Sequence, residues 1–225
     1  MITFDRLGVV LRPDNPDQAK FNAGMAAADG VVHMLYRFAE KCPRWHGRFI
    51  DWTEFAAGGE FPYLRNCIRY ARLSTQGALL FDSNQDVISP RGAHDTMGCE
   101  DPRIVRFEGA FYIFYCVFDG RKPRVAIART SDFTHYERLG VVDHSMGDKD
   151  AVIFPERIGG RIAYMHRVAL SIQIDYFDSI DQLLSPLSWV GYEARVERQT
   201  VLRGTYPFER MKIGCGVPPL KTEYG

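Results

Sequence analysis

The sequence predicts an all-β protein built as an incomplete β-propeller, and three observations support this prediction. Long stretches with helical periodicity are nearly absent. Short apolar runs separated by Gly, Pro, Asp and Asn dominate instead, which is typical of strands joined by tight turns. The same order of polar start, strand, turn and aromatic strand also recurs along the chain, and repetition of this kind is typical of propellers and solenoids.

Four segments share this plan, and they cover residues 21–37, 98–118, 148–167 and 212–225. The first three reach a tight turn whose positive φ favours glycine. These turns are predicted at Asp29-Gly30, Glu108-Gly109 and Gly159-Gly160. An aromatic-rich strand then returns, as in residues 110–117 and 161–166. A third strand is expected to follow Cys67, Arg124 and Ser171.

The fourth segment stops early. Gly225 falls where the other segments have their turn, so the sequence predicts a propeller truncated after roughly three and a half blades. An open propeller leaves apolar surface in water, which costs about 25 cal/mol per Å². We therefore interpret residues 1–225 as a single, incomplete propeller domain of a longer protein. The alternative is a short variant that pairs with another chain.

Composition argues against several functional classes. Lys+Arg and Asp+Glu both number 28, so the formal net charge is zero, whereas nucleic-acid binders usually carry a basic excess. No stretch approaches the roughly 18 apolar residues of a membrane span, and the N-terminus lacks a secretory signal pattern. The five cysteines include no CxxC pair. We therefore expect free thiols, no zinc and a cytoplasmic location.

Polar side chains gather at the start of each repeated segment. That start forms the innermost strand of a blade, and innermost strands line the channel of a propeller, so these side chains should converge on one site. The candidates are Asn22 and Arg37 in the first segment, Glu100, Asp101 and Arg103 in the second, Lys149, Asp150 and Arg167 in the third, and Lys212 in the fourth.

The tetrapeptide at residues 100–103 has two interpretations. Asp-Pro is common in surface turns, where the charges would form an exposed salt bridge. Its place just before a strongly apolar strand favours a site instead. Strand alternation then predicts that Glu100 and Asp101 point to opposite faces, so that one faces the substrate and the other braces the site. Burial and Glu100 would raise the pKa of Asp101 and Arg103 would lower it, and the sequence leaves that balance open.

Lys149, Arg167 and Lys212 place one cation on each of three inner strands or strand ends. Each alone is compatible with a solvated surface position, where an ion pair contributes little. Together they would repel one another unless an anion joined them, and phosphate suits an Arg fork and a Lys point charge. No GxSxG, HExxH or P-loop motif occurs, so we expect no metal and no cofactor, with inorganic phosphate as co-substrate. The histidines without ligand spacing are interpreted as surface or packing residues: His33, His46, His94, His135 and His144.

Four blocks resemble glycoside hydrolase family 130: FNAG with LYR, GCEDPRI, KDAVIFPERIGGRIAYMHR and KIGCGVPPLKTEYG. They occur in the family's order and span most of residues 21–225. The resemblance implies a five-bladed β-propeller that acts on β-mannosides. Most members are inverting phosphorylases that release α-mannose 1-phosphate, and some are hydrolases that lack the phosphate-binding cations.

The resemblance also implies roles for individual positions. The Asp of the EDPR block is the family's catalytic acid and corresponds to Asp101. The phosphate-binding residues of the KD, HR and KIG motifs correspond to Lys149, Arg167 and Lys212. Asn22 and Arg37 match positions near the mannose-binding end. The full substrate-binding set that we expect is Asn22, Arg37, Glu100, Arg103 and Asp150.

One departure concerns the anion site. The family continues past the TEYG-like block with a Trp-containing strand and a Tyr-His-Gly block whose His contacts phosphate, and this sequence stops at Gly225. Residues 1–225 are therefore expected to be inactive on their own.

The predicted reaction is inverting phosphorolysis of a mannosyl-glucose or a manno-oligosaccharide. Phosphate is already an anionic nucleophile and needs no general base, so one acid with several cations fits phosphorolysis better than hydrolysis. The alternatives are a β-mannoside hydrolase of the same family, a non-catalytic carbohydrate-binding propeller and an unfolded fragment. The expected partners are the oligosaccharide and phosphate, and a homo-oligomer is left open. Acceptor contacts are expected from Trp45, Trp52 and residues 56–63.

Overall fold

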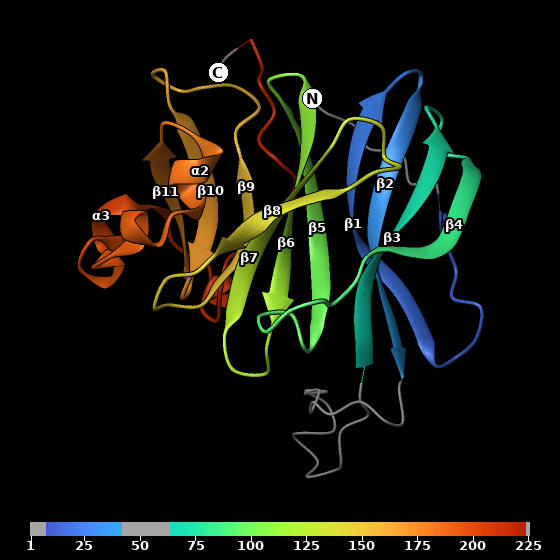
Figure 1. Cartoon of the computed structure of the whole chain (residues 1–225), viewed down its shortest axis with the longest axis horizontal. Helices are drawn as coiled ribbons and strands as arrows, with labels where there is room; N and C mark the ends of the chain where they lie inside the picture. The colour runs from blue at the N-terminus through green and yellow to red at the C-terminus, as the bar shows by residue number, and fades with distance from the viewer. Residues whose placement is uncertain (1–7, 42–63, 224–225) are drawn as a thin grey trace.

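A computed structural model describes residues 8–41 and 64–223 of the chain. Within this part the strands form three antiparallel sheets of four strands each (Figure 1). The predicted all-β class is therefore confirmed, while the three sheets do not close into a ring.

Each sheet is built from consecutive strands. The first has the order β1-β2-β3-β4, with β1 Gln18–Ala28, β2 Val31–Lys41, β3 Leu64–Ser74 and β4 Leu79–Ile88. The second has the order β5-β6-β7-β8, with β5 Gly98–Phe107, β6 Ala110–Phe118, β7 Pro123–Thr130 and β8 Glu137–Val142. The third has the order β9-β10-β11-β12, with β9 Asp148–Ile153, β10 Ile162–Val168, β11 Ser171–Phe177 and β12 Thr200–Leu202.

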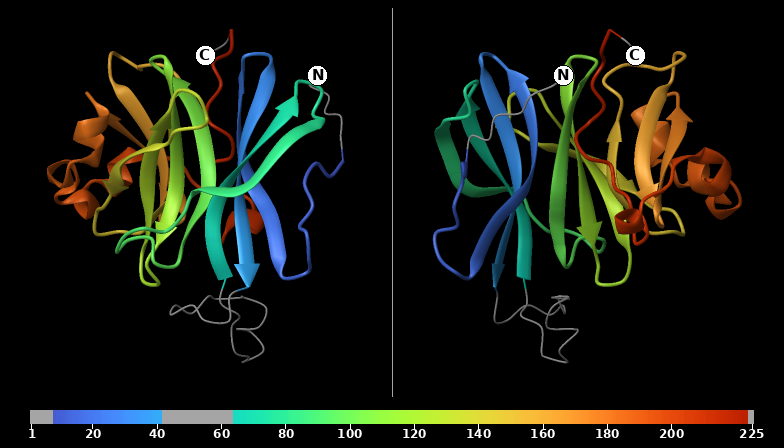
Figure 2. Two further views of the ribbon diagram at one scale, coloured as in Figure 1. Left: turned by 45° about the vertical axis from the view of Figure 1, so that its right-hand side comes forward. Right: turned by 180° about the vertical axis from the view of Figure 1, so that it is seen from behind.

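The three sheets stand next to one another along the molecule, in the order of the sequence (Figure 2). The first strands of the sheets, β1, β5 and β9, contact one another in sequence order. We call β1, β5 and β9 the inner strands. The polar starts of three repeated segments are thereby brought together, as the sequence predicted.

The three predicted hairpin turns are confirmed. Asp29-Gly30 joins β1 to β2 with φ of 52° and 75°, and Glu108-Gly109 joins β5 to β6 with φ of 46° and 85°. Gly159-Gly160 lies between β9 and β10 with φ of 59° and 79°. Two consecutive residues with positive φ match the right-handed twist of the paired strands, which is why glycine recurs there.

The second sheet is covered on both faces. Ile113, Tyr115 and Val117 of β6 pack in a cluster with residues of the first sheet such as Leu35. The alternate residues of β6, Tyr112 and Phe114, pack in another cluster with the third sheet. Because side chains alternate along a strand, this double burial explains why β6 is apolar at almost every position.

The strand expected after Ser171 is present as β11 and is followed by short helices. The strand ends at Phe177, and Ile180–Leu184 forms the short helix α2. The side chain of Ser179 accepts a hydrogen bond from the backbone N of Gln182 at 3.1 Å, which satisfies one free donor at the helix start. The 3-10 helices η1 Pro186–Trp189 and η2 Tyr192–Ala194 and the helix α3 Val196–Gln199 then lead into β12.

The prediction of an inner strand beginning at Lys212 is wrong for the part of the chain that the structure describes. Residues 203–223 contain the 3-10 helix η3 Pro207–Glu209 and no strand. A strand needs a neighbour for its backbone groups. Here the backbone N of Ile213 donates one bond of 3.4 Å to the carbonyl of Leu170, and no ladder forms.

Two further predictions concern cysteines and membranes. Cys67, Cys99, Cys116 and Cys215 are buried free thiols, as predicted, and Cys42 lies outside the described residues. No helix in residues 8–41 and 64–223 is long and apolar enough to cross a membrane.

Candidate active site

Each inner strand carries a β-bulge at the same place. In β1, β5 and β9 the register against the neighbouring strand slips after Phe21, Glu100 and Lys149. The residue that follows each slip has a positive φ: 47° at Asn22, 52° at Asp101 and 53° at Asp150. Asn and Asp tolerate this left-handed conformation better than other non-glycine residues, and a bulge re-aims the side chains around it.

The first two bulges meet in a network around Arg37. Asn22 donates from Nδ2 to Oδ1 of Asp101 at 2.8 Å, and Arg37 donates from NH1 to the same oxygen at 3.1 Å. Arg37 also donates from NH2 to Oε1 of Glu100 at 3.1 Å and from Nε to Oδ1 of Asn66 at 2.8 Å. One guanidinium therefore joins both carboxylates to the first sheet.

Strand alternation wrongly predicted that Glu100 and Asp101 would point apart. Both carboxylates reach Arg37, because the bulge at Asp101 breaks the alternation of the strand. The expected bracing role still suits Glu100, whose side chain is 7% exposed against 16% for Asp101. The cation beside Asp101 is Arg37 rather than Arg103.

The two carboxyl groups differ in pKa. Burial raises the pKa of Glu100, and the nearby charges of Arg37 and Lys149 offset only part of that effect. Burial also acts to raise the pKa of Asp101. There, however, Arg37, the hydrogen bond from Asn22 and the charge of Lys149 outweigh burial and hold the pKa below its ordinary value. The balance of these effects therefore favours the ionised form of Asp101.

The third bulge gathers cations around a single carboxylate. Arg103 and Arg167 both contact Asp150, at 3.2 Å from NH2 to Oδ1 and 3.2 Å from NH1 to Oδ2. Lys149 and Arg167 are direct cross-strand partners, and Nζ of Lys149 lies 3.8 Å from Oε2 of Glu100. Burial lowers the pKa of Lys149, but the neighbouring Cys116, Glu100 and Asp101 raise it overall, so the ammonium keeps its charge.

Lys212 is exposed, and no contact joins it to the other two predicted phosphate-binding cations within residues 8–41 and 64–223. The chain two residues further on does approach the site. A Cβ added to Gly214 would lie 2.8 Å from Oδ2 of Asp150 and 3.6 Å from NH1 of Arg167. A side chain at this position would displace the Asp150 carboxylate, so glycine allows the segment to lie against the third bulge.

A cavity of about 830 Å³ opens beside the bulges. Four of the predicted site residues line it: Asn22, Asp101, Arg103 and Asp150. Residues 216–221 form another part of the wall. Within the described residues, Nε of Arg103 is buried without a hydrogen-bond partner and remains a donor for a ligand. This volume lies within the range of small-molecule binding sites.

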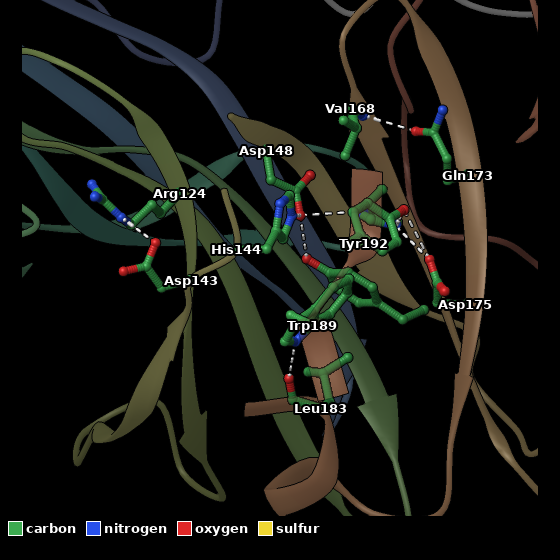
Figure 3. Close-up of polar contacts among 12 residues, drawn as sticks. Arg124, Asp143, His144, Asp148, Val168, Gln173, Asp175, Leu183, Trp189 and Tyr192 are labelled. Carbon is green, nitrogen blue, oxygen red and sulfur yellow. Dashed lines mark hydrogen bonds and ion pairs between the residues drawn. The ribbon is translucent and has the colours of Figure 1, made fainter. Parts of the chain in front are cut away.

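A buried polar cluster lies behind β9, and sequence reasoning missed it (Figure 3). His144, Asp148 and His166 bring their polar side-chain atoms within 4.8 Å of one another, a spacing that could hold a metal ion. The two ring nitrogens of His166 contact Asp148 and Asp175 at 2.9 and 3.0 Å. These carboxylates, acting against burial, raise the pKa of His166 to about 9, and an imidazolium has no lone pair for a metal.

The signal that could have revealed this cluster is its place in the repeat. Asp148 and His166 directly precede the predicted cations Lys149 and Arg167. Of the residues predicted for the acceptor side, Trp45, Trp52 and residues 56–63 lie outside the described part of the chain.

The fold and site define a class of protein: antiparallel sheets set side by side, whose bulged inner strands place carboxylates and cations at one cavity. Comparison with known proteins then gives the family. The model of the glycoside hydrolase 130 family, described as beta-1,4-mannooligosaccharide phosphorylase, matches residues 63–225. The chain belongs to this family, which confirms the resemblance seen in the sequence.

Individual relatives agree with this assignment. The 1,2-beta-oligomannan phosphorylase of Thermoanaerobacter sp. (strain X514) is 28% identical over 211 residues, covering 92% of this chain and 62% of the relative. The Beta-1,2-mannobiose phosphorylase of Listeria innocua serovar 6a is 27% identical, covering 91% and 65%. The solved Beta-1,2-mannobiose phosphorylase from Listeria innocua has the same fold over 96% of this chain and 69% of its own, with a TM-score of 0.71 at 21% identity. The chain thus spans 62% and 65% of the length of these two curated relatives.

Proposed function

We propose that this chain is part of an enzyme that cleaves β-mannosides with inorganic phosphate. The reaction inverts the configuration at the anomeric carbon and releases α-mannose 1-phosphate. The observation that carries the proposal is the adjacency of two different charge environments at one cavity. Asp101 and Asn22 line the cavity at the first two bulges, and Asp150 and Arg103 line it at the third. The cations Lys149 and Arg167 lie next to Asp150 and outside the cavity lining. Family membership and the names of the relatives support the same reaction class.

Asp101 is the proposed general acid. It lines the cavity and is partly exposed, whereas Glu100 is buried behind it. In inverting cleavage the acid protonates the leaving oxygen while the nucleophile attacks from the opposite face. The family resemblance implies that the proton travels through a mannose hydroxyl. We assign mannoside contacts to Asn22 and Arg37, with Glu100 as the brace.

Lys149 and Arg167 are the proposed phosphate ligands, and Lys212 is proposed to join them. Arg103 and Asp150 complete the substrate-binding set. Two like charges directly opposite each other on paired strands repel, so an anion between Lys149 and Arg167 would stabilise the pair. The free Nε of Arg103 offers a further donor among the described residues.

Phosphate binding would also prepare the acid. Arg37, the bond from Asn22 and the charge of Lys149 hold the pKa of Asp101 below its ordinary value. An arriving phosphate would neutralise part of the charge of Lys149, and a sugar hydroxyl that accepts from the carboxyl would replace the bond donated by Asn22. Both changes raise the pKa of Asp101, so we propose that the carboxyl takes up a proton from solvent as the two substrates bind.

The finer assignments belong to the same proposal. The three sheets are proposed to be successive blades of a five-bladed propeller, within a single catalytic domain. We infer that the partners are a β-mannoside oligosaccharide and phosphate, without nucleic acid or membrane, that no cofactor is needed, and that the protein acts in the cytoplasm. Self-association is left open.

The test is phosphate-dependent turnover. Because residues 1–225 are expected to be inactive on their own, this test and those below use the protein extended past Gly225 to the length of its relatives. It is incubated with β-1,2- and β-1,4-mannobiose, with and without inorganic phosphate, and the anomer of the product is followed by NMR. We expect α-mannose 1-phosphate with phosphate and no product without it. Free mannose formed without phosphate would indicate the hydrolase alternative. Sugar binding without any product would indicate a non-catalytic binding protein, and a circular-dichroism melt without a cooperative transition would indicate an unfolded fragment.

A further inference from the structure

The cluster behind β9 is a chain of side chains linked by short polar contacts. His166 lies between Asp148 and Asp175, with Nδ1 2.9 Å from one carboxylate and Nε2 3.0 Å from the other. Tyr164 donates its hydroxyl to Asp148 at 3.1 Å, and Tyr192 donates its hydroxyl to Asp175 at 3.0 Å. Trp189 closes the cluster from the segment after β11 (Figure 3).

Burying the charged groups of this cluster costs free energy, so their presence needs an explanation. Burial raises the pKa of the Asp148 carboxyl, but His166 and His144 lower it to about 2 overall. The pKa of His166 is raised to about 9, so the buried contact between Asp148 and His166 is an ion pair. Asp148 and His166 are 1% and 0% exposed. Replacing such groups with apolar ones is often neutral or stabilising, so their presence is consistent with a role beyond stability.

The place of the cluster relative to the cations suggests that role. Asp148 precedes Lys149 on β9, and His166 precedes Arg167 on β10. Lys149 and Arg167 are cross-strand partners, and the bond between Asp148 and His166 therefore joins the two strands one residue before each cation. Successive residues of a strand point to opposite faces, so the bond lies behind the strands and the cations lie in front.

We propose that Asp148 is a positioning residue for phosphate, which fixes the separation and direction of Lys149 and Arg167 through its bond to His166. The proposal rests on the proposed function for the identity of the anion. The bulge at Asp150 interrupts the ladder beside Lys149, so the backbone alone does not fix this region. Lys149 and Arg167 are like charges on directly opposed residues, and the contact of Asp148 with His166 ties the two strands together beside them.

The other two inner strands support this assignment. Asp148 lies two residues before its bulge residue, and His166 lies opposite the bulge. The equivalent residues are Lys20 and Tyr36 in the first sheet, and Cys99 and Tyr115 in the second. In the first sheet both contact Asp82, at 3.0 and 2.7 Å. In the second sheet the equivalent cysteine and tyrosine are buried. A direct pairing of opposite charges at these two positions occurs, within the described residues, only behind the predicted phosphate ligands.

The structure offers matched variants. Asp148→Asn and Asp175→Asn each remove one buried carboxylate from His166, but only Asp148 lies on the strand that carries Lys149. Tyr164→Phe and Tyr192→Phe repeat the comparison with a smaller change, since each removes one hydroxyl bond to one of these carboxylates. The Tyr192 hydroxyl also lies 3.1 Å from Nε2 of His166, so Tyr192→Phe is the more disruptive control. The readouts are the Kd of inorganic phosphate by calorimetry on the full chain, KM for phosphate and for mannobiose, and the melting temperature.

We expect Asp148→Asn to weaken phosphate binding by about tenfold and to leave KM for mannobiose within about twofold, because charge-assisted contacts depend on geometry. Asp175→Asn should change phosphate binding by less than about threefold. Tyr164→Phe should weaken phosphate binding by about threefold, and Tyr192→Phe should leave it unchanged. If Asp148→Asn fails to fold, the comparison of Tyr164→Phe with Tyr192→Phe tests the positioning role instead.

Equal phosphate affinity in the two members of a pair, with equal losses of melting temperature, would overturn the positioning role and leave the cluster purely structural. A wild-type chain that binds no phosphate would overturn it as well. A chain that binds phosphate, shows the expected difference between the pairs and yet forms no mannose 1-phosphate would refute the proposed reaction while supporting the positioning role.

Discussion

The bulges of β5 and β9 share a backbone and differ in charge. Asp101 and Asp150 occupy equivalent positions, with φ of 52° and 53°. Around Asp101, the carboxylates of Glu100 and Asp101 share one guanidinium. Around Asp150, two guanidinium groups share one carboxylate. The backbone thus places an aspartate at the same point of each strand, and the neighbouring side chains decide whether that place is rich in carboxylates or in cations.

The difference arises at two positions of the repeat. The residue before the bulge is Glu100 in β5 and Lys149 in β9, and its cross-strand partner is Cys116 in one sheet and Arg167 in the other. A repeated strand can therefore place carboxylates at one bulge and cations at the next, without any change of fold.

The strongest test of this comparison is the same substitution at both bulges. Asp101→Asn should lower turnover by roughly 10²–10⁴-fold, the usual contribution of a general acid, with KM for phosphate little changed. Asp150→Asn should lower turnover by less than about tenfold, because Asp150 is proposed to bind substrate rather than to donate the proton. Steady-state kinetics of the two variants measures the difference. Near wild-type turnover of Asp101→Asn would show that Asp101 is not the general acid. Equal losses of turnover in the two variants would show that the two bulges do not differ in function.

A second, smaller effect should separate the cations. Arg167→Ala and Lys149→Ala each remove one charged donor and should raise KM for phosphate by about ten- to a hundredfold, since a hydrogen bond to a charged group contributes about 1.5–3 kcal/mol. KM for mannobiose should change by less than threefold in both. Arg37→Ala is the matched control on the carboxylate side and should affect the mannoside and turnover more than phosphate. Equal loss for both substrates in Arg167→Ala and Lys149→Ala would argue against the anion site.

A third test sharpens the comparison through pH. The pKa of His166 is raised to about 9 by Asp148 and Asp175, against the opposing effect of burial. Stability from this charge is complete below the unfolded value near 6.5 and is lost as the pH rises through about 9. Denaturant titrations should show the free energy of unfolding falling by about 3 kcal/mol over that interval. The fall should be smaller in Asp175→Asn and unchanged in His135→Gln, which alters an exposed side chain. A flat profile in the wild type would show that His166 is not charged.

Much of the fold could be predicted from the sequence because hairpins leave strong local signals. The turns at Asp29-Gly30, Glu108-Gly109 and Gly159-Gly160 need residues that accept positive φ, and this need is visible without a structure. The segment from Lys212 was mispredicted for the opposite reason. Its sequence resembles the other inner strands, but strand formation depends on a hydrogen-bonding neighbour, and that neighbour is not a property of the segment itself.

The site was predicted as a set of residues but not as a geometry. The repeat correctly indicated that residues 22, 101 and 150 would come together, because they open equivalent segments. The bulges were missed, since Asn and Asp are as common in turns as in left-handed strand positions. Without the bulge, the sharing of Arg37 by Glu100 and Asp101 could not be foreseen. The cluster at His166 was missed because its members are far apart in sequence.

The double burial of β6 has a consequence for dissecting this chain. Ile113 and Val117 need the first sheet, while Phe114 needs the third. Removing either outer sheet would expose a whole apolar layer, at about 25 cal/mol for every Å² uncovered. The middle sheet therefore joins the other two into one cooperative folding unit. Deletion variants that remove the sheet on either side of it should yield insoluble protein rather than smaller folded domains.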